Sequence, residues 1–156
     1  MSIVIQPRRP PRISPPSQPV IAAVDGSAGG RAAAAEAIAT ARDLGAPVLF
    51  AHVRRGPSTV WGRPFYQRRL EWALRKGRDA LAAAAEHARA AGVEAQTEIL
   101  EGPPARRIAE LARSRNARLV IVGPRRRRPR ASVFRRLAAV GLPVRRADSP
   151  PKPAHT

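Results

Sequence analysis

Short apolar runs alternate with longer amphipathic stretches through most of the chain. Residues 20–24, 47–53 and 119–122 are apolar runs, rich in β-branched side chains and short enough to be buried strands. Residues 93–100 are expected to form a further strand, the strand at 119–122 to begin at 118, and 143–147 has the pattern of an edge strand. Between these runs, apolar residues recur at the spacing of one helix face. Helices are predicted over residues 31–44, 68–91 and 132–140, and a further helix is predicted to begin at residues 102–104.

Five strands alternating with four helices predict an α/β fold, an open five-stranded parallel sheet with helices on both faces. Ligands of such sheets bind at the carboxyl ends of the strands, where the strand order reverses. The turn at Asp25, the loop after Val53 and the loop after Val122 should therefore lie along one edge of the sheet.

The strand at 118–122 leads into the most basic segment of the chain. It passes through Gly123 and an arginine-rich loop to Ser132, which is expected to cap the next helix. Free backbone N–H groups and the helix dipole favour an anion at such a corner. The arginines of this predicted anion site are Arg125, Arg126, Arg127, Arg128 and Arg130.

Composition supports a negatively charged partner. The 156 residues contain 29 Lys and Arg against 11 Asp and Glu, a net charge of +18. This balance indicates phosphates, nucleic acid or an anionic surface, although a solvated surface with no partner would give the same count. Almost all the cations are arginine, whose planar fork suits bidentate phosphate contacts.

Three segments are expected. Residues 1–18 form a Pro- and Arg-rich disordered arm, 19–147 the α/β domain, and 148–156 a Pro-rich disordered tail. The absence of cysteine excludes disulfides, thiol nucleophiles and Cys-ligated zinc. No apolar run reaches the length of a membrane span, and no signal or transit peptide is recognisable. We expect a cytoplasmic protein without a membrane partner.

Half of the six aromatic residues fall in one predicted loop, residues 54–67. Trp61, Phe65 and Tyr66 lie there among arginines, and they are candidates for a lid over a bound base. In the helix that follows, Trp72 falls opposite the apolar stripe, beside Arg75 and Lys76. We expect Trp72 to pack beneath the preceding loop; the alternative is that it awaits a partner.

Residues for catalysis are few. The sequence has no P-loop, no dinucleotide-binding glycine pattern and no nucleophile elbow, and its histidines lack metal-ligand spacing. Asp25 is the only acid expected near the ligand edge, so no acid–base pair forms. Ser27 and Ser132 are interpreted as helix caps or phosphate donors, and His52 as a structural histidine. The sequence predicts neither a metal site nor an enzyme.

Residues 19–147 resemble the universal stress protein family. The landmarks that carry the resemblance occur in the family's order and with similar spacing. They are Val20-Ile-Ala-Ala-Val-Asp-Gly-Ser27, Phe50-Ala-His-Val53, Glu101-Gly-Pro-Pro-Ala105, Leu119-Val-Ile-Val-Gly123, Ser132-Val133 and Pro143-Val144.

The resemblance implies a Rossmann-like fold of the adenine-nucleotide α-hydrolase type, with Asp25 at the base or ribose and Val53 beside adenine. It also implies a phosphate loop of the pattern Gly, two residues, Gly, nine residues, Gly, then Ser or Thr. Gly123 and Ser132 fill the outer positions, but Arg126 and Ala131 replace the other two glycines and the loop is five residues shorter. The implied ATP site is therefore degenerate.

Three functions remain open. The first is a regulatory domain that binds ATP, another adenine nucleotide or another phosphate ligand, weakly or not at all. The second is a nucleic-acid or polyanion binder that uses the arginine loop and the basic arm. The third is a ligand-free family member that acts through protein contacts. The family's usual homodimer through the fifth strand is disfavoured here, because Arg145 and Arg146 occupy positions that are usually apolar.

Overall fold

The computed structural model describes residues 18–54, 63–124 and 132–148, with side chains from residue 67 onward in the second helix. The basic arm up to residue 17, the arginines between 125 and 130, Trp61 and the tail from 149 lie outside this description. The described elements are β1 (Val20–Ala23), α1 (Ala28–Leu44), β2 (Val48–Arg54), α2 (Arg63–Ala90), β3 (Ala95–Glu101), α3 (Pro104–Ser114), β4 (Leu119–Val122), α4 (Val133–Ala139) and β5 (Val144–Arg146).

All five strands pair in parallel, in the order β3-β2-β1-β4-β5. The predicted α/β class, strand count and direction are confirmed. The chain moves outward from β1 through β2 to β3, then returns to the other side of β1 with β4. The strand order therefore reverses between β1 and β4, and their carboxyl ends mark the expected ligand position.

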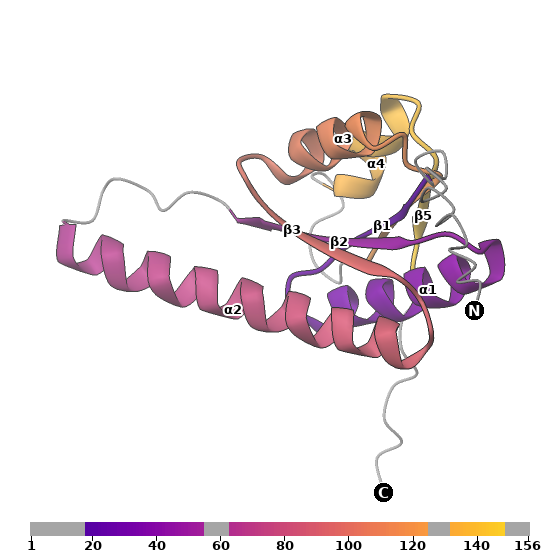
Figure 1. Cartoon of the computed structure of the whole chain (residues 1–156). Helices are drawn as coiled ribbons and strands as arrows, with labels where there is room; N and C mark the ends of the chain where they lie inside the picture. The colour runs from indigo at the N-terminus through magenta and orange to yellow at the C-terminus, as the bar shows by residue number, and fades with distance from the viewer. Residues whose placement is uncertain (1–17, 55–62, 125–131, 149–156) are drawn as a thin grey trace, which may run out of the picture.

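Helices cover both faces of the sheet (Figure 1). On one face α1 and α2 pack on a buried cluster centred on Phe50 and Ile121, and on the other α3 and α4 pack on a cluster centred on Leu49 and Ile108. Neighbouring strand residues such as Leu49 and Phe50 point to opposite faces, and both faces are buried. This explains why the central strands β1 and β4, and β2 up to Ala51, are continuous apolar runs without polar alternation.

Two helices begin earlier than the sequence pattern predicts. In α1 the first residue is Ala28, because Ser27 caps the helix, so Gly29 and Gly30 lie in its first turn instead of a preceding loop. In α2 the first residue is Arg63, which places Phe65 and Tyr66 in the helix and not in the predicted loop. Pro64 is tolerated there because the N–H groups of a first turn have no partner within the helix.

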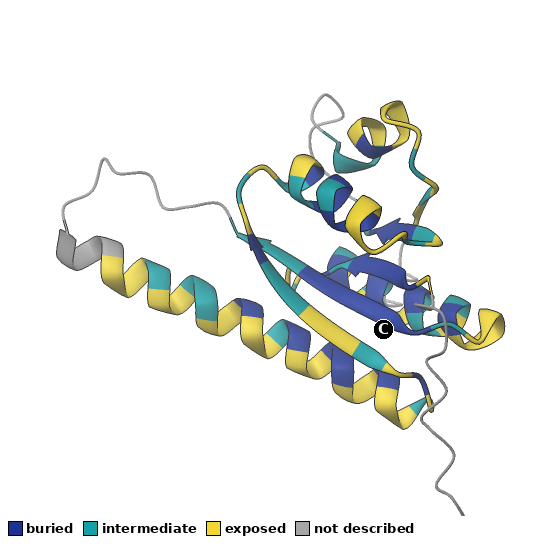
Figure 2. Cartoon of the chain, turned by 45° about the horizontal axis from the view of Figure 1, so that its top comes forward, coloured by how far each residue is buried: buried dark blue, intermediate teal, exposed yellow. Residues whose placement is uncertain are grey.

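Only the second half of α2 packs on the sheet. Its first half extends past the end of the sheet, and burial begins at Gly77 (Figures 1 and 2). The side chain of Trp72, which we expected to be packed under the preceding loop, is instead 62% exposed. Among the described residues, no helix combines the length and the apolar character needed to cross a bilayer.

Candidate functional site

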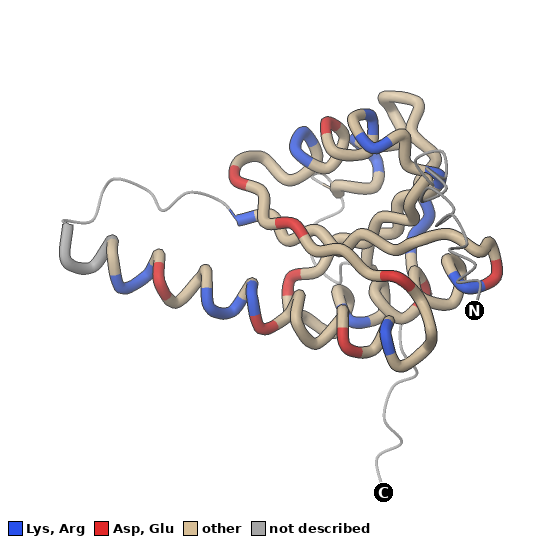
Figure 3. Tube along the Cα trace, viewed as in Figure 1, with Lys and Arg blue, Asp and Glu red and all other residues tan. Residues whose placement is uncertain are grey.

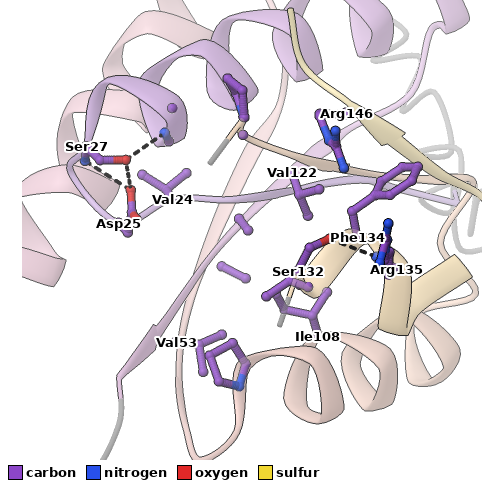
Figure 4. Close-up of a pocket in the computed structure, with 18 residues that line it drawn as sticks. Val24, Asp25, Ser27, Val53, Ile108, Val122, Ser132, Phe134, Arg135 and Arg146 are labelled. Atoms are coloured by element: carbon purple, nitrogen blue, oxygen red, sulfur yellow. Dashed lines mark hydrogen bonds between the residues drawn. The ribbon is translucent and has the colours of Figure 1, made fainter. Parts of the chain in front are cut away.

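The turn after β1 holds a network of polar groups at the start of α1. Asp25 Oδ1 accepts hydrogen bonds from the backbone N of Ser27, at 3.0 Å, and from its hydroxyl. Ser27 Oγ in turn accepts from the backbone N of Gly30, at 3.1 Å. Asp25 thus places a carboxylate at this helix N-terminus, where the dipole favours negative charge. Figure 4 shows Asp25 and Ser27 joined in this network at the start of α1.

Glycines allow β4 to end directly against this first turn. A Cβ atom at Gly123 would lie 2.2 Å from the carbonyl oxygen of Gly29, and one at Gly29 would lie 2.8 Å from the carbonyl oxygen of Pro124. No side chain larger than hydrogen fits between two backbones at these distances. The close approach accounts for glycine at position 123 whether or not a ligand is present.

A cavity of about 310 Å³ lies at the carboxyl ends of β1, β2 and β4, where the strand order reverses. This volume is at the lower end of the range of small-molecule sites. Its apolar lining comes from the strands, α3 and the segment around α4. These residues are Ala23, Val24, Ala51, Val53, Pro104, Ile108, Val122, Val133 and Phe134.

Polar groups lie at two ends of this lining (Figure 4). Asp25 and Ser27 form one end, and Ser132, Arg135 and Arg146 form the other. Along the described lining, Asp25 is the single acid and the two arginines are the only cations. The cavity therefore offers a negative end, an apolar middle and a positive end.

Two interactions position the groups at the positive end. Ser132 Oγ accepts a hydrogen bond from the backbone N of Arg135, at 3.1 Å, and so caps α4 while its own proton remains available to donate. The guanidinium of Arg146 lies 4.8 Å from the centre of the Phe134 ring, a cation–π contact that holds the arginine at the cavity wall.

His52 acts as a structural residue, which agrees with the interpretation of the sequence. Its Nδ1 lies 2.8 Å from the backbone oxygen of Val24 and joins the ends of β1 and β2. A Cβ on Gly77 would lie 2.5 Å from the imidazole, so α2 packs directly on the ring. Among the described residues, no group of three or more His, Cys, Asp and Glu side chains could hold a metal ion.

The structure brings half of the predicted ligand-binding residues to one cavity. Asp25, Ser27, Val53, Gly123 and Ser132 line it. The five loop arginines and Trp61 lie outside the described residues, and Phe65 and Tyr66 are placed in α2 without described side chains. Sequence reasoning missed other lining residues, chiefly Ile108, Phe134, Arg135 and Arg146.

A signal for Arg146 was present in the sequence. It ends a predicted strand, and in the sheet it pairs with Val122, the last residue of β4. The carboxyl end of the fifth strand belongs to the same ligand edge as the ends of the other strands, so the sequence pattern already places Arg146 near the cavity.

Comparison with known proteins identifies the family. The model of the Universal stress protein family matches residues 16–138. The chain belongs to this family. No curated protein is significantly similar to it in sequence.

Solved universal stress proteins share the fold. One from Burkholderia pseudomallei is 24% identical, with a TM-score of 0.71 over 85% of this chain and 97% of its own. One from Archaeoglobus fulgidus in complex with dAMP is 23% identical, with a TM-score of 0.65 over 84% and 98%. One from Arabidopsis thaliana with AMP bound is 18% identical, with a TM-score of 0.67 over 86% and 93%.

Proposed function

We propose that this universal stress protein is a regulatory domain that binds an adenine nucleotide or a related phosphate ligand weakly, without turning it over. The observation that carries the proposal is the polarity of the cavity. Its acid and its two arginines lie at opposite ends of an apolar lining at the reversal point of the sheet. The dAMP and AMP complexes of similar proteins support an adenine ligand.

The charges orient the ligand. Ribose hydroxyls can donate to the Asp25 carboxylate, whereas phosphate oxygens placed there would be repelled by it. Arg135, Arg146 and the Ser132 hydroxyl can donate to phosphate at the other end. The base then lies against the apolar middle, next to Val53 and Ile108.

Binding without turnover follows from the side chains that line the cavity. Asp25 is the only carboxylate of the described lining, and no histidine or lysine joins it. A general acid and a general base are therefore not both present. Ser27 donates its hydroxyl proton only to the Asp25 carboxylate, which is a weak base, and no histidine or lysine of the described lining is there to take that proton, so Ser27 is not activated as a nucleophile.

Neighbouring arginines on β5 supply a test with a matched control. Arg146 lines the cavity, whereas Arg145 lies 3.4 Å from Glu36 on α1 and does not line it. Isothermal titration with ATP, AMP, adenosine and inorganic phosphate should rank the nucleotides above phosphate. Arg146→Gln should weaken AMP binding by about tenfold or more, the usual cost of a charge-assisted hydrogen bond, and Arg145→Gln should leave it nearly unchanged.

The alternatives give distinct results. Equal affinity for ATP and inorganic phosphate would show that the cavity does not recognise adenine. Equal losses in the two arginine variants would assign binding to overall charge. If none of the compounds binds, the result would favour the alternative in which the protein acts through protein contacts alone.

A further inference from the structure

The first half of α2 presents an aromatic side chain within a ring of cations. On a helix surface, the neighbours of residue i are the residues at i±3 and i±4. For Trp72 these four positions are Arg68, Arg69, Arg75 and Lys76. Every helical neighbour of the exposed Trp72 is basic, and we call these five residues the Trp72 patch.

The Trp72 patch is open to solvent. Trp72 is 62% exposed, more than the other large apolar side chains that are exposed in the described chain, Leu44 at 40% and Val140 at 49%. The four cations are exposed as well. In Figure 3, basic positions lie along the part of α2 that extends beyond the sheet, with acidic positions between them.

The cations of the patch are not in direct ion pairs within the described part of the protein, although Glu71 and Asp79 lie on the same stretch of helix. Other exposed or half-buried arginines do have a carboxylate within 4.0 Å, namely Arg54, Arg89, Arg106, Arg107, Arg115 and Arg145. No such pair involves a patch residue among the described side chains. Lys76 instead places its ammonium 5.3 Å from the centre of the Trp72 ring.

One end of the patch lies beside the turn between β1 and α1. A Cβ on Gly26 would lie 3.5 Å from Cε of Lys76. The stem of Lys76 therefore runs close to this turn, while its ammonium lies over the Trp72 ring. From Lys76 back to Arg68 the patch extends about 12 Å along the helix, at 1.5 Å per residue.

We propose that the Trp72 patch binds a single strand of nucleic acid. Cations that lack protein partners can contact successive phosphates, and an exposed indole can stack with an unpaired base. A duplex keeps its bases paired and stacked in its interior, so its phosphates could contact the cations but none of its bases could stack on the indole. A lipid surface needs a broad apolar face, whereas the surroundings of Trp72 are charged at all four neighbouring positions. This inference does not depend on the nucleotide site.

Fluorescence anisotropy with labelled oligothymidylate and oligouridylate tests the inference. Trp72→Ala should weaken binding by roughly 5- to 100-fold, the usual loss for one stacked base, and Trp72→Phe should restore much of it. A variant in which Arg68, Arg69, Arg75 and Lys76 are all glutamine should lower the salt slope of log K by up to about 3, at ~0.7 for each phosphate contact. A duplex of equal length should bind more weakly.

A control must remove equal charge elsewhere, because the whole chain carries +18. Glutamine at Arg42, Arg113, Arg118 and Arg136, which are exposed and have no carboxylate within 4.0 Å among the described side chains, does so away from the patch. This control should lose far less affinity and salt dependence than the patch variant. The proposal is overturned if the two quadruple variants weaken binding equally, if Trp72→Ala binds like the parent, or if neither strand binds. Circular dichroism should show all variants folded.

Discussion

The two halves of α2 belong to one continuous helix but are stabilised differently. From Gly77 to Ala90 the inward positions are buried and mostly alanine, so the helix lies close to the sheet. From residue 67 to 76 no described residue is buried (Figure 2). The apolar spacing is the same in both, since Leu74 and Leu81 are seven residues apart on one face. A shared hydrophobic stripe therefore does not imply a shared partner surface.

Because the two halves of α2 are packed differently, they have different roles. The packed half supports His52, which joins the ends of β1 and β2 beside the cavity. The projecting half makes little use of tertiary packing, which supplies most helical stability in proteins. Substitutions in it should alter surface binding with little effect on the fold, and substitutions in the packed half should do the reverse.

Paired leucine truncations give the largest expected contrast. Leu81 is 4% exposed in the cluster between α2 and the sheet, whereas Leu74 is half-buried. Leu81→Ala should lower the free energy of unfolding by about 2–4 kcal/mol, because truncation of a buried leucine side chain leaves a cavity. Leu74→Ala should cost less than about 1 kcal/mol. Urea denaturation measures both, and equal costs would mean that the projecting half is packed as firmly as the rest.

A smaller effect tests the contact through which α2 reaches the cavity. Gly77→Ala inserts a methyl group 2.5 Å from the His52 ring, while alanine itself favours the helix by about 1 kcal/mol. Overpacking typically costs about 1–3 kcal/mol, so a net destabilisation of about 1 kcal/mol is expected.

The same substitution in a His52→Ala background should change sign. With the ring removed, alanine at position 77 should stabilise the protein by about 1 kcal/mol, and the double-mutant cycle then isolates the contact. Stabilisation by Gly77→Ala in both backgrounds would show that the helix can move away from the ring at no cost.

Much of the fold was predictable because its signals are local. The runs 20–24 and 119–122 are apolar on both faces, as buried parallel strands require, and each is joined to the next strand by a helical period. The start of α2 was not predictable, because the aromatic and arginine residues within 54–67 favour a loop over an apolar helix face. The position along α2 at which burial begins was not predictable either, since the apolar stripe of the helix continues into the half that projects past the sheet.

At the site, strand ends were a better guide than side-chain chemistry. Asp25 follows one apolar run and Val53 ends another, and both line the cavity. Whether Arg145 or Arg146 reaches it depends on the register of β5, in which Arg146 pairs with Val122. A shift of one residue would exchange the two, and nothing local to the sequence fixes that register.

The smallest expected effect concerns Lys76 and Trp72 on the projecting half. Lys76→Ala removes one exposed cation–π contact, so the free energy of unfolding should change by no more than about 1 kcal/mol. In a Trp61→Phe background, acrylamide should quench Trp72 more strongly once the lysine is gone, and Lys76→Arg should retain the protection. A loss above 2 kcal/mol would instead show that this stretch helps to hold the fold together, and the contrast between the two halves of α2 would disappear.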